Sequence, residues 1–338
     1  MTDLSFVHLT FDCIADSPIQ LGGYWAGNRL RGALGYILLR NTCPEDGRGT
    51  REHAKTCPAC WLLSHRLDAG HARRAYSIVP PLPAPETVLA GQRFTFTITL
   101  YGDGWQYLPY FVLAVGEMGR TGVGRGTFTV ASITARNPFL RQEEVLLAPG
   151  ADLVSVPTLS VAWQDMPDVS SYFANASLSL AFLTPTRLTA QERLMKRPAF
   201  GVLFRRLLHR IDTLGTQFAG MPRRTEADIA RLHAIADTVV LTAAETRWIE
   251  LRPRSGRDRR HKPMSGFVGQ ATYESTDWTP LLPYLLFGQG VQVGKMATKG
   301  NGVYQVALGI DSYWLGLPFA NQARFGAKNG LRMRGGNE

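Results

Sequence analysis

The sequence lacks any hydrophobic run long enough to cross a membrane. Its longest clean apolar stretch lies around residues 281–287, far short of the roughly 20 apolar residues that a membrane-spanning helix needs. The N-terminus has no basic segment followed by an apolar block, so we expect no signal peptide. Cysteine is scarce, with 4 in 338 residues, which argues against a disulfide framework. These absences indicate a cytoplasmic protein without a membrane partner.

Acidic residues are outnumbered by basic ones. Asp and Glu total 27 against 37 Lys and Arg, so the formal net charge is +10. The excess is local, because residues 187–260 hold 16 Lys and Arg against 8 Asp and Glu. Clustered cations suit a polyanion, since neutralising its phosphates releases condensed counterions. We favour nucleic acid as the partner over a purely solubilising role.

A longer pattern occurs twice. Leu-Pro-Tyr at 108–110 and at 282–284 each lead through an apolar stretch into three glycines spaced Gly, five residues, Gly, one residue, Gly. The two sets are Gly116, Gly122 and Gly124, and Gly294, Gly300 and Gly302. Glycine permits positive φ and close backbone approach, and basic side chains in both loops favour an anion such as phosphate. The alternative is a tight turn that packs helix against strand.

Hydrophobic periodicity gives both halves the same order of elements. The first half predicts strands at 5–11, 74–79, 93–100 and 128–133 and helices at 26–40 and 107–116. The second predicts strands at 177–183, 248–251, 266–273 and 303–308 and helices at 199–214 and 279–288, with Gly215 as a helix stop and Thr225 as a helix start. Two βαββαβ units predict an α+β fold of two tandem ferredoxin-like domains.

The expected domain boundaries follow from these elements. Residues 1–150 form the N-terminal domain, with a cysteine-containing insertion at 41–73. Residues 151–176 form the connection, 177–318 the C-terminal domain with its glycine-rich loop, and 319–338 a basic tail. Recurrence of one supersecondary unit favours duplication over two unrelated domains.

Short motifs run through nearly the whole chain in a fixed order. They are Leu-Arg-Gly-Ala-Leu-Gly at 30–35, Cys43 with Cys-Pro-Ala-Cys at 57–60, Tyr-Ser-Ile-Val-Pro-Pro at 76–81, Gly91, the first glycine loop, Trp248, Arg-Ser-Gly-Arg at 254–257, Gly-Phe-Val-Gly at 266–269 and the run from Gly294 to Gly302. Each motif alone is weak, but the ordered combination is specific. In this order they resemble the RAMP-class endoribonucleases that cut CRISPR repeat RNA, the Cas six family.

The resemblance implies RNA cleavage that requires no metal. The ribose 2′-hydroxyl attacks the adjacent phosphate and leaves a 2′,3′-cyclic phosphate and a 5′-hydroxyl, so the protein supplies proton transfer and charge stabilisation. Family members often place a histidine in or just after the first helix, sometimes with a tyrosine. The candidates are therefore His53, then His65, then His71, together with Tyr36. An ordinary surface role is the alternative for each histidine.

One position departs from the family pattern. Many members have a histidine two residues before the Gly-Lys of the second glycine loop, where this chain has Gln292. Glutamine cannot shuttle a proton at neutral pH. A non-cleaving RNA-binding subunit of a CRISPR effector complex therefore remains the alternative to the nuclease. A nucleic-acid-binding protein outside CRISPR biology is disfavoured, because the motif order would then be accidental.

Candidate phosphate contacts lie on the predicted helices, in the glycine loops and in a basic run between two predicted strands. They are Arg29, Arg31, Arg120, Arg125, Arg205, Arg206, Arg252, Arg254, Arg257, Arg259, Arg260, Lys295 and Lys299. Proteins read RNA duplexes through shape and backbone, so we expect a stem-loop repeat on a basic groove. For the arginines of helix 199–214, the alternative is the exposed face of an amphipathic helix.

Three cysteines form a separate candidate site. Cys43, Cys57 and Cys60 could bind a structural zinc ion with His65 or His53 as fourth ligand, since a Cys-x-x-Cys pair suits tetrahedral coordination. The alternative is a set of reduced, partly buried thiols. A metal-bound His65 could not act as a base, which is a further reason to rank His53 first among the catalytic candidates. Cys13 belongs to a predicted strand and is expected in the core.

Overall fold

The computed structural model describes residues 4–47, 49–63, 74–166, 177–251, 264–308 and 313–315. The N-terminal domain is a five-stranded antiparallel sheet in the order β3-β5-β1-β6-β7. Its main elements are β1 (Phe6–Ala15), α1 (Ala26–Thr42), β3 (Tyr76–Val79), β5 (Arg93–Tyr101), α4 (Leu108–Thr121), β6 (Phe128–Asn137) and β7 (Gln142–Leu147). Shorter elements are β2 (Ile19–Gln20), η1 (Gly23–Trp25), α2 (Arg51–Thr56), α3 (Pro58–Leu62), β4 (Thr87–Val88) and η2 (Gly102–Tyr107).

The C-terminal domain repeats this arrangement with the sheet order β11-β12-β8-β13-β14. Its main elements are β8 (Ser177–Thr186), α5 (Phe200–Phe218), α6 (Glu226–Thr238), β11 (Val240–Ile249), β12 (Gly266–Glu274), α7 (Leu282–Val291) and β13 (Tyr304–Leu308). Shorter ones are η3 (Trp163–Asp165), β9 (Leu188–Ala190), β10 (Arg193–Met195), η4 (Ala297–Lys299) and β14 (Tyr313–Leu315). In both sheets the first strand of the unit lies between the third and the fourth, which confirms two tandem ferredoxin-like domains.

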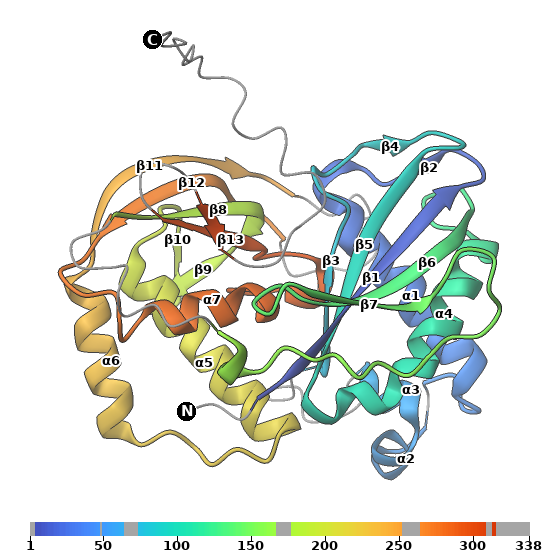
Figure 1. Cartoon of the computed structure of the whole chain (residues 1–338), viewed down its shortest axis with the longest axis horizontal. Helices are drawn as coiled ribbons and strands as arrows, with labels where there is room; N and C mark the ends of the chain where they lie inside the picture. Colours follow the sequence, from blue (N-terminus) through green and yellow to red (C-terminus); the bar gives the residue numbers. More distant parts are fainter. Residues whose placement is uncertain are drawn as a thin grey trace, which may run out of the picture.

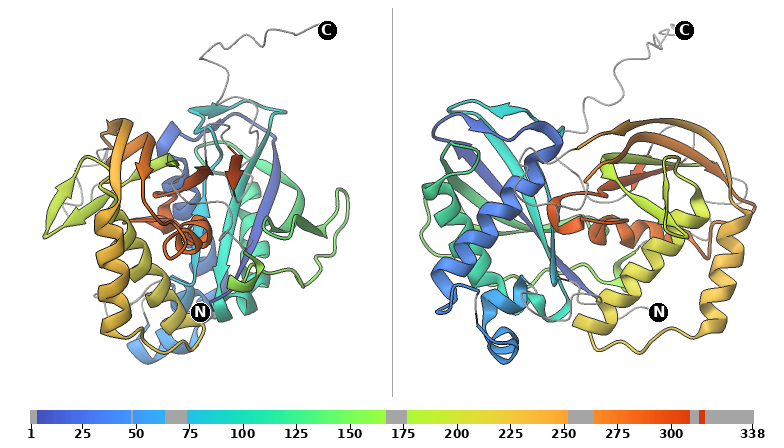
Figure 2. Two further views of the ribbon diagram at one scale, coloured as in Figure 1. Left: turned by 60° about the vertical axis from the view of Figure 1, so that its left-hand side comes forward. Right: turned by 180° about the vertical axis from the view of Figure 1, so that it is seen from behind.

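Each sheet has two helices of its βαββαβ unit on one face (Figures 1 and 2). α1 and α4 pack on the first sheet, and α5 and α7 on the second, and each set closes its own hydrophobic core. α5 illustrates the cause: Leu203, Leu207 and Ile211 recur at four-residue spacing and are all buried, as expected for an apolar helix stripe. Among the described residues, none of the helices combines the length and apolar character needed to span a bilayer.

The two domains meet along α7 and the edge of the first sheet. The Phe6 ring lies 5.1 Å from that of Phe287, and a Cβ on Gly290 would come 2.1 Å from Phe6. Buried Tyr101 donates its hydroxyl to Gly290 O at 3.2 Å, and the guanidinium of Arg210 lies 5.8 Å from the Tyr101 ring centre. This seam is therefore tightly packed and partly polar.

The structure corrects two glycine predictions. Gly116 is not in a loop, because α4 continues through it to Thr121. Gly215 does not end α5, which runs on to Phe218. The structural equivalents in the duplication are instead Gly122 and Gln292, since each ends its helix with positive φ and donates its N–H to the helix, to Met118 O and Gly288 O respectively. The two Leu-Pro-Tyr motifs both begin helices, whereas the glycine triplets are not in register.

Candidate nucleic-acid interface and cysteine cluster

The second glycine loop docks against the first turn of α1. A Cβ added to Gly27 would lie 2.3 Å from the carbonyl oxygen of Lys299, and one on Gly300 would lie 3.0 Å from Pro80. Gly294, Gly300 and Gly302 all have positive φ, between 78° and 85°. Glycine is required here because a side chain would clash or strain the backbone. The loop thus joins the C-terminal domain to α1 and β3.

Basic side chains gather where this loop meets α1 and β3. We call Arg31, Arg74, Tyr76 and Thr298 the arginine junction; Lys299 follows Thr298 in the chain and is partly buried. Arg74 donates from Nη1 to Thr298 Oγ1 at 3.4 Å. Burial lowers the pKa of the Arg74 guanidinium; Tyr76 opposes this effect, and the nearby charge of Arg31 adds to it. The buried Nε of Arg31 has no hydrogen-bond partner among the described residues, so cationic donor capacity remains at the junction.

Arg74 was missed at the sequence level, although it comes just before the Tyr-Ser-Ile-Val-Pro-Pro motif. Its Nε donates to Leu63 O at 3.0 Å. Leu63 and Arg74 flank segment 64–73, so both ends of that segment lie at the arginine junction. The catalytic candidates His65 and His71 fall in this segment, outside the described residues. Chain connectivity alone therefore associates His65 with the junction.

A second basic surface follows the outer face of α1. Arg29 and Arg125 line a cavity of about 830 Å³ with Gly122 and Gly124 of the first glycine loop. Farther along α1, Tyr36 is 56% exposed and accepts a hydrogen bond from Arg40 Nη1 at 3.3 Å. Arg29, Tyr36 and Arg40 are spaced by seven and four residues, which places them on one helix face. We call this set, with Arg125, the α1 strip.

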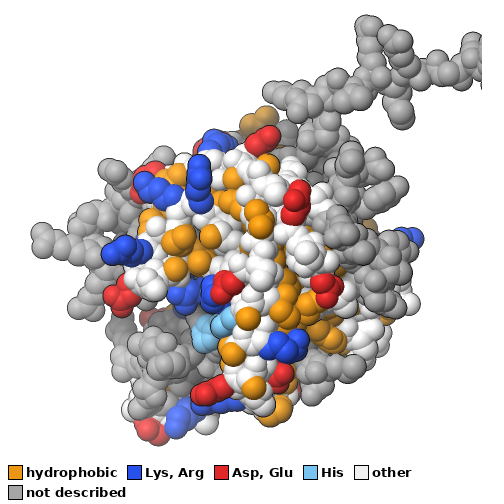
Figure 3. Space-filling view, turned by 90° about the vertical axis from the view of Figure 1, so that its left-hand side faces the viewer, with side chains coloured by type: hydrophobic (Ala, Val, Ile, Leu, Met, Phe, Trp, Pro, Cys, Tyr) orange, Lys and Arg blue, Asp and Glu red, His pale blue; other side chains and the backbone are white. Residues whose placement is uncertain are grey.

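Other predicted cations are engaged within the protein. Arg120 forms an ion pair with Glu117 at 2.6 Å, and exposed Arg205 pairs with Asp237. Arg206 donates to Thr189 O. On the face shown in Figure 3, basic side chains are interspersed with acidic and hydrophobic ones rather than joined in one patch. The described residues on this face therefore do not form one continuous basic surface.

The remaining predicted cations differ in what can be said of them. Lys295 has an exposed side chain, and its backbone N–H donates to Arg187 O at 3.3 Å. The basic run lies outside the described residues, and the paired strands β11 and β12 flank it; its candidates are Arg252, Arg254, Arg257, Arg259 and Arg260. Lys295 is therefore accessible to solvent in the second glycine loop.

Gln292 has a structural position. It is buried, adopts φ of 63° at the end of α7, and donates from Nε2 to Ile78 O at 2.9 Å across the domain seam. A buried side-chain amide with a backbone partner holds the two domains in register. Gln292 thus joins the C-terminal domain to β3 through Nε2, while its buried Oε1 has no hydrogen-bond partner among the described residues.

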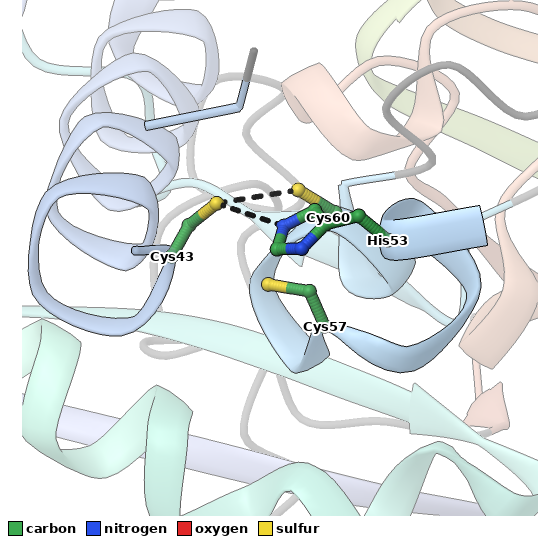
Figure 4. A group of neighbouring side chains, drawn as sticks. All are labelled: Cys43, His53, Cys57 and Cys60. Atoms are coloured by element: carbon green, nitrogen blue, oxygen red, sulfur yellow. Dashed lines mark hydrogen bonds between the residues drawn. The ribbon is translucent and has the colours of Figure 1, made fainter. Parts of the chain in front are cut away.

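Three cysteines and one histidine converge at the C-terminal end of α1 (Figure 4). The potential ligand atoms of Cys43, His53, Cys57 and Cys60 all lie within 4.8 Å of one another, and we call this group the cysteine cluster. Cys43 Sγ lies 3.6 Å from Cys60 Sγ and 3.3 Å from His53 Nε2. The group could hold a metal ion. Cys13 is buried elsewhere, in β1.

The pKa values of two thiols in the cysteine cluster, Cys43 and Cys60, shift in opposite directions. Burial acts to raise the pKa of the Cys43 thiol, but hydrogen bonds from the Gly47 N–H and from His53 outweigh it and lower that pKa to about 7. Burial raises the pKa of the Cys60 thiol, and the neighbouring Cys43 raises it further. Of these two thiols, Cys43 therefore loses its proton more readily.

His53 is occupied at both ring nitrogens. Nε2 faces Cys43 Sγ, and Nδ1 lies 3.2 Å from Glu45 Oε1. A general base must reach the proton that it removes, and this ring points into the cysteine cluster instead. His8 is also unsuited to proton transfer, because burial, with a contribution from Arg136, lowers its pKa to about 3. Neither histidine is placed at the arginine junction.

Two different family models match the chain, one in each domain. Residues 4–158 match a model described as an N-terminal domain. Residues 180–304 match a model described as CRISPR-associated endoribonuclease Cas6. The two matches fall on the two ferredoxin-like halves. No curated protein matches the sequence.

Solved structures match over nearly the whole chain. A Cas6 product complex has 16% identity and a TM-score of 0.53 and covers 88% of this chain and 98% of its own. A Cas6 from Thermus thermophilus has 14% identity and a TM-score of 0.50, with 90% and 99% coverage. A partial Cas6-RT-Cas1–Cas2 complex has 14% identity and a TM-score of 0.56, covering 92% of this chain and 47% of that chain. At such identities the structures establish a shared fold.

Proposed function

We propose that the protein is a metal-independent endoribonuclease that cuts precursor CRISPR RNA within repeat stem-loops, because residues 180–304 match the Cas6 endoribonuclease model and solved Cas6 structures share its fold. The observation that carries the proposal is the arginine junction, where Arg74 of the N-terminal domain contacts Thr298 of the second glycine loop and the charge of Arg31 is close enough to act on Arg74. Phosphodiester cleavage by an internal 2′-hydroxyl needs charge stabilisation and proton transfer at one place. The junction offers the first directly.

In the proposed reaction the 2′-hydroxyl oxygen bonds to the adjacent phosphorus as the bond to the 5′-oxygen breaks. The products are a 2′,3′-cyclic phosphate and a 5′-hydroxyl. Arg31 stabilises the charge that develops on the phosphoryl oxygens, and Arg74 holds the junction in shape through Leu63 and Thr298. His65 replaces His53 as the first candidate for proton transfer, because His53 is engaged in the cysteine cluster.

We further propose that the stem of the repeat lies along the α1 strip. Arg29, Arg40 and Arg125 supply cations along one helix face and its neighbouring loop, and Tyr36 adds an exposed ring that can stack on an unpaired base. This gives Tyr36 a binding role rather than a catalytic one. The product could stay bound through the same contacts, because they do not involve the bond that is cut.

A non-cleaving RNA-binding subunit of a CRISPR effector complex is the second candidate. It is favoured by Gln292, which serves as a buried interdomain contact, and by the position of His53. Under this alternative the α1 strip binds RNA in the same way. The difference is confined to the arginine junction, where no bond would be cut.

Cleavage of the cognate repeat tests the proposal. The full-length protein is mixed with repeat RNA from its own genomic array in Mg²⁺-free buffer containing EDTA, under single-turnover conditions and for a short time. The proposal predicts one cut within the repeat, and loss of that cut in His65→Ala with affinity retained. Tight binding without any product would support the second candidate instead. No binding to the repeat would contradict both.

A further inference from the structure

We propose that Cys43, His53, Cys57 and Cys60 bind one Zn²⁺ in a closed structural site that fixes residues 43–63 onto the end of α1. Four ligands come from three separate elements: the residue that ends α1, helix α2, and both the start and the body of α3. They approach one another only because the chain folds back twice within 18 residues. This site is separate from the proposed RNA-cleaving junction.

The distances suit zinc. With Zn–S bonds of about 2.3 Å and Zn–N bonds of about 2.0 Å, a tetrahedral ion holds its ligand atoms roughly 3.5–3.8 Å apart. The Cys43 Sγ to Cys60 Sγ distance is 3.6 Å, and Cys43 Sγ to His53 Nε2 is 3.3 Å. The remaining pairs, which include Cys57, lie within 4.8 Å of one another, so the ligands would close in by at most about 1 Å when the ion binds. Figure 4 shows all four side chains directed toward one point.

The ligand types favour zinc over harder cations. Three thiolates and one imidazole are typical of zinc, whereas Mg²⁺ and Ca²⁺ prefer oxygen ligands. The site is also closed, since the three cysteines are buried and the histidine side chain is only 15% exposed. Four protein ligands leave no coordination position for water or substrate, which is the pattern of a structural site rather than a catalytic one.

Two neighbouring groups support the ligands. Glu45 Oε1 lies 3.2 Å from His53 Nδ1, and a carboxylate at that nitrogen fixes the tautomer that presents Nε2 to a metal. The Gly47 N–H donates to Cys43 Sγ at 3.2 Å, as expected where a backbone N–H stabilises a thiolate. The second set of contacts is thus arranged for coordination.

The site would hold elements that cannot stay folded alone. α2 has six residues and α3 five, well below the length at which isolated helices are stable. α3 carries Trp61, which stacks on Tyr107 at 4.7 Å and meets Phe218 of the C-terminal domain at 5.7 Å. The residue that follows α3, Leu63, accepts the hydrogen bond of Arg74. Zinc would therefore order a segment that supports both the domain seam and the arginine junction.

Metal content of the full-length protein tests the proposal directly. The protein is purified without chelator or affinity metal, and elemental analysis is expected to give about one zinc per chain. Co²⁺ exchanged into the site should give the absorption of a tetrahedral thiolate complex at one equivalent, and Zn²⁺ should remove it. Zinc well below one per folded chain, a different metal, or a Cys43–Cys60 disulfide found by peptide mapping would each overturn the proposal.

Variants separate coordination by His53 from catalysis by His53. His53→Cys retains four ligands and should keep the zinc, whereas His53→Ala should lose it or bind it far more weakly. Glu45→Gln should weaken zinc binding about 10- to 100-fold. Cys13→Ala is the matched control, because Cys13 is buried outside the cluster, and it should keep one zinc. Full zinc in His53→Ala would remove His53 from the ligand set.

RNA assays distinguish failure of this proposal from failure of the proposed function. Zinc content is read without RNA, so an inactive protein with one zinc supports the site all the same. Cleavage by His53→Cys at near the wild-type rate is expected, because a fourth thiolate maintains the cluster. Loss of cleavage in His53→Cys with zinc retained would return a catalytic role to His53.

Discussion

At the level of single residues, Arg31 is the cation that we expect to act on the RNA phosphate. Its Nε is buried without a partner among the described residues, while Arg74 beside it is fixed to Leu63 and Thr298. A charged donor left unpaired in the free protein is costly unless a ligand satisfies it. An RNA phosphate beside the Arg31 guanidinium would also offset the repulsion between the charges of Arg31 and Arg74.

Arg31→Gln is expected to slow single-turnover cleavage about 100-fold at saturating RNA, the scale on which enzymes lose rate when one charge-stabilising donor is removed. The affinity for uncleaved repeat should change far less, because the α1 strip is intact. Arg193→Gln, on exposed β10, is the control and should cleave normally. Equal loss of binding and rate in Arg31→Gln would show a general RNA contact instead of a role in the reaction.

His8 gives a residue-scale prediction about stability. Its pKa falls from 6.5 to about 3 in the folded protein, so below pH 6.5 the unfolded chain takes up a proton that the folded chain does not. The free energy of unfolding therefore contains a contribution from the neutral His8 ring that is complete above about pH 6.5. Between about pH 6.5 and about pH 3 this contribution is lost at about 1.4 kcal/mol per pH unit. Between about pH 7.5 and about pH 5, urea unfolding of wild type should lose about 2 kcal/mol more than that of His8→Gln. Parallel losses in the two proteins would contradict this assignment.

At the level of secondary-structure elements, α1 takes part in each of the sites described above. Its first turn receives the second glycine loop, one face carries the α1 strip, and its C-terminal end supplies Cys43. The contact at Gly27 depends on the absence of a side chain, because a Cβ would lie 2.3 Å from backbone oxygen. Backbone cannot move aside as readily as a flexible side chain.

Two glycines of α1 form a matched pair. Gly27→Ala should destabilise the protein by about 1–3 kcal/mol through overpacking, measured by chemical unfolding. Gly32→Ala is the control, since nothing lies within 4 Å of its Cβ position and alanine favours helix by up to about 1 kcal/mol. If both variants were equally stable, the close approach of Lys299 to α1 would not be a feature of the protein in solution.

Local patterns predicted most of the main elements, and the reason is visible in α5 and β5. The exceptions are β7, which was not predicted, and β11, which was predicted at 248–251 and lies at Val240–Ile249. Apolar residues at helical or alternating spacing must face a core, so periodicity locates such elements whatever the rest of the chain does. The glycine triplets misled because spacing along the chain does not reveal where a helix ends. Gly116 stays within α4, whereas Gln292 takes the positive φ that glycine takes at position 122.

At the scale of the whole molecule, the features that periodicity could not predict are those made by both domains. Arg74 contacts Thr298 across 224 residues, and Gln292 contacts Ile78 across 214. Arg210 was expected on a wet helix face but is buried against Val291 O and the Tyr101 ring. Such contacts depend on how the two domains pack against each other. Periodicity within one half of the sequence carries no information on that packing. The grouping of the three cysteines was predictable because they are close in the sequence, and His53, one of the two histidines considered, lies beside them.

The central claim is that a 2′-hydroxyl of the repeat RNA is the nucleophile. The most direct measurement compares natural repeat RNA with the same RNA carrying one 2′-deoxy nucleotide immediately 5′ of the scissile phosphate, and determines the product ends by mass spectrometry. The account predicts a 2′,3′-cyclic phosphate and a 5′-hydroxyl from the natural RNA and no cut at that position in the deoxy RNA, with equal binding of both. Cleavage of the deoxy RNA at the same site would contradict it.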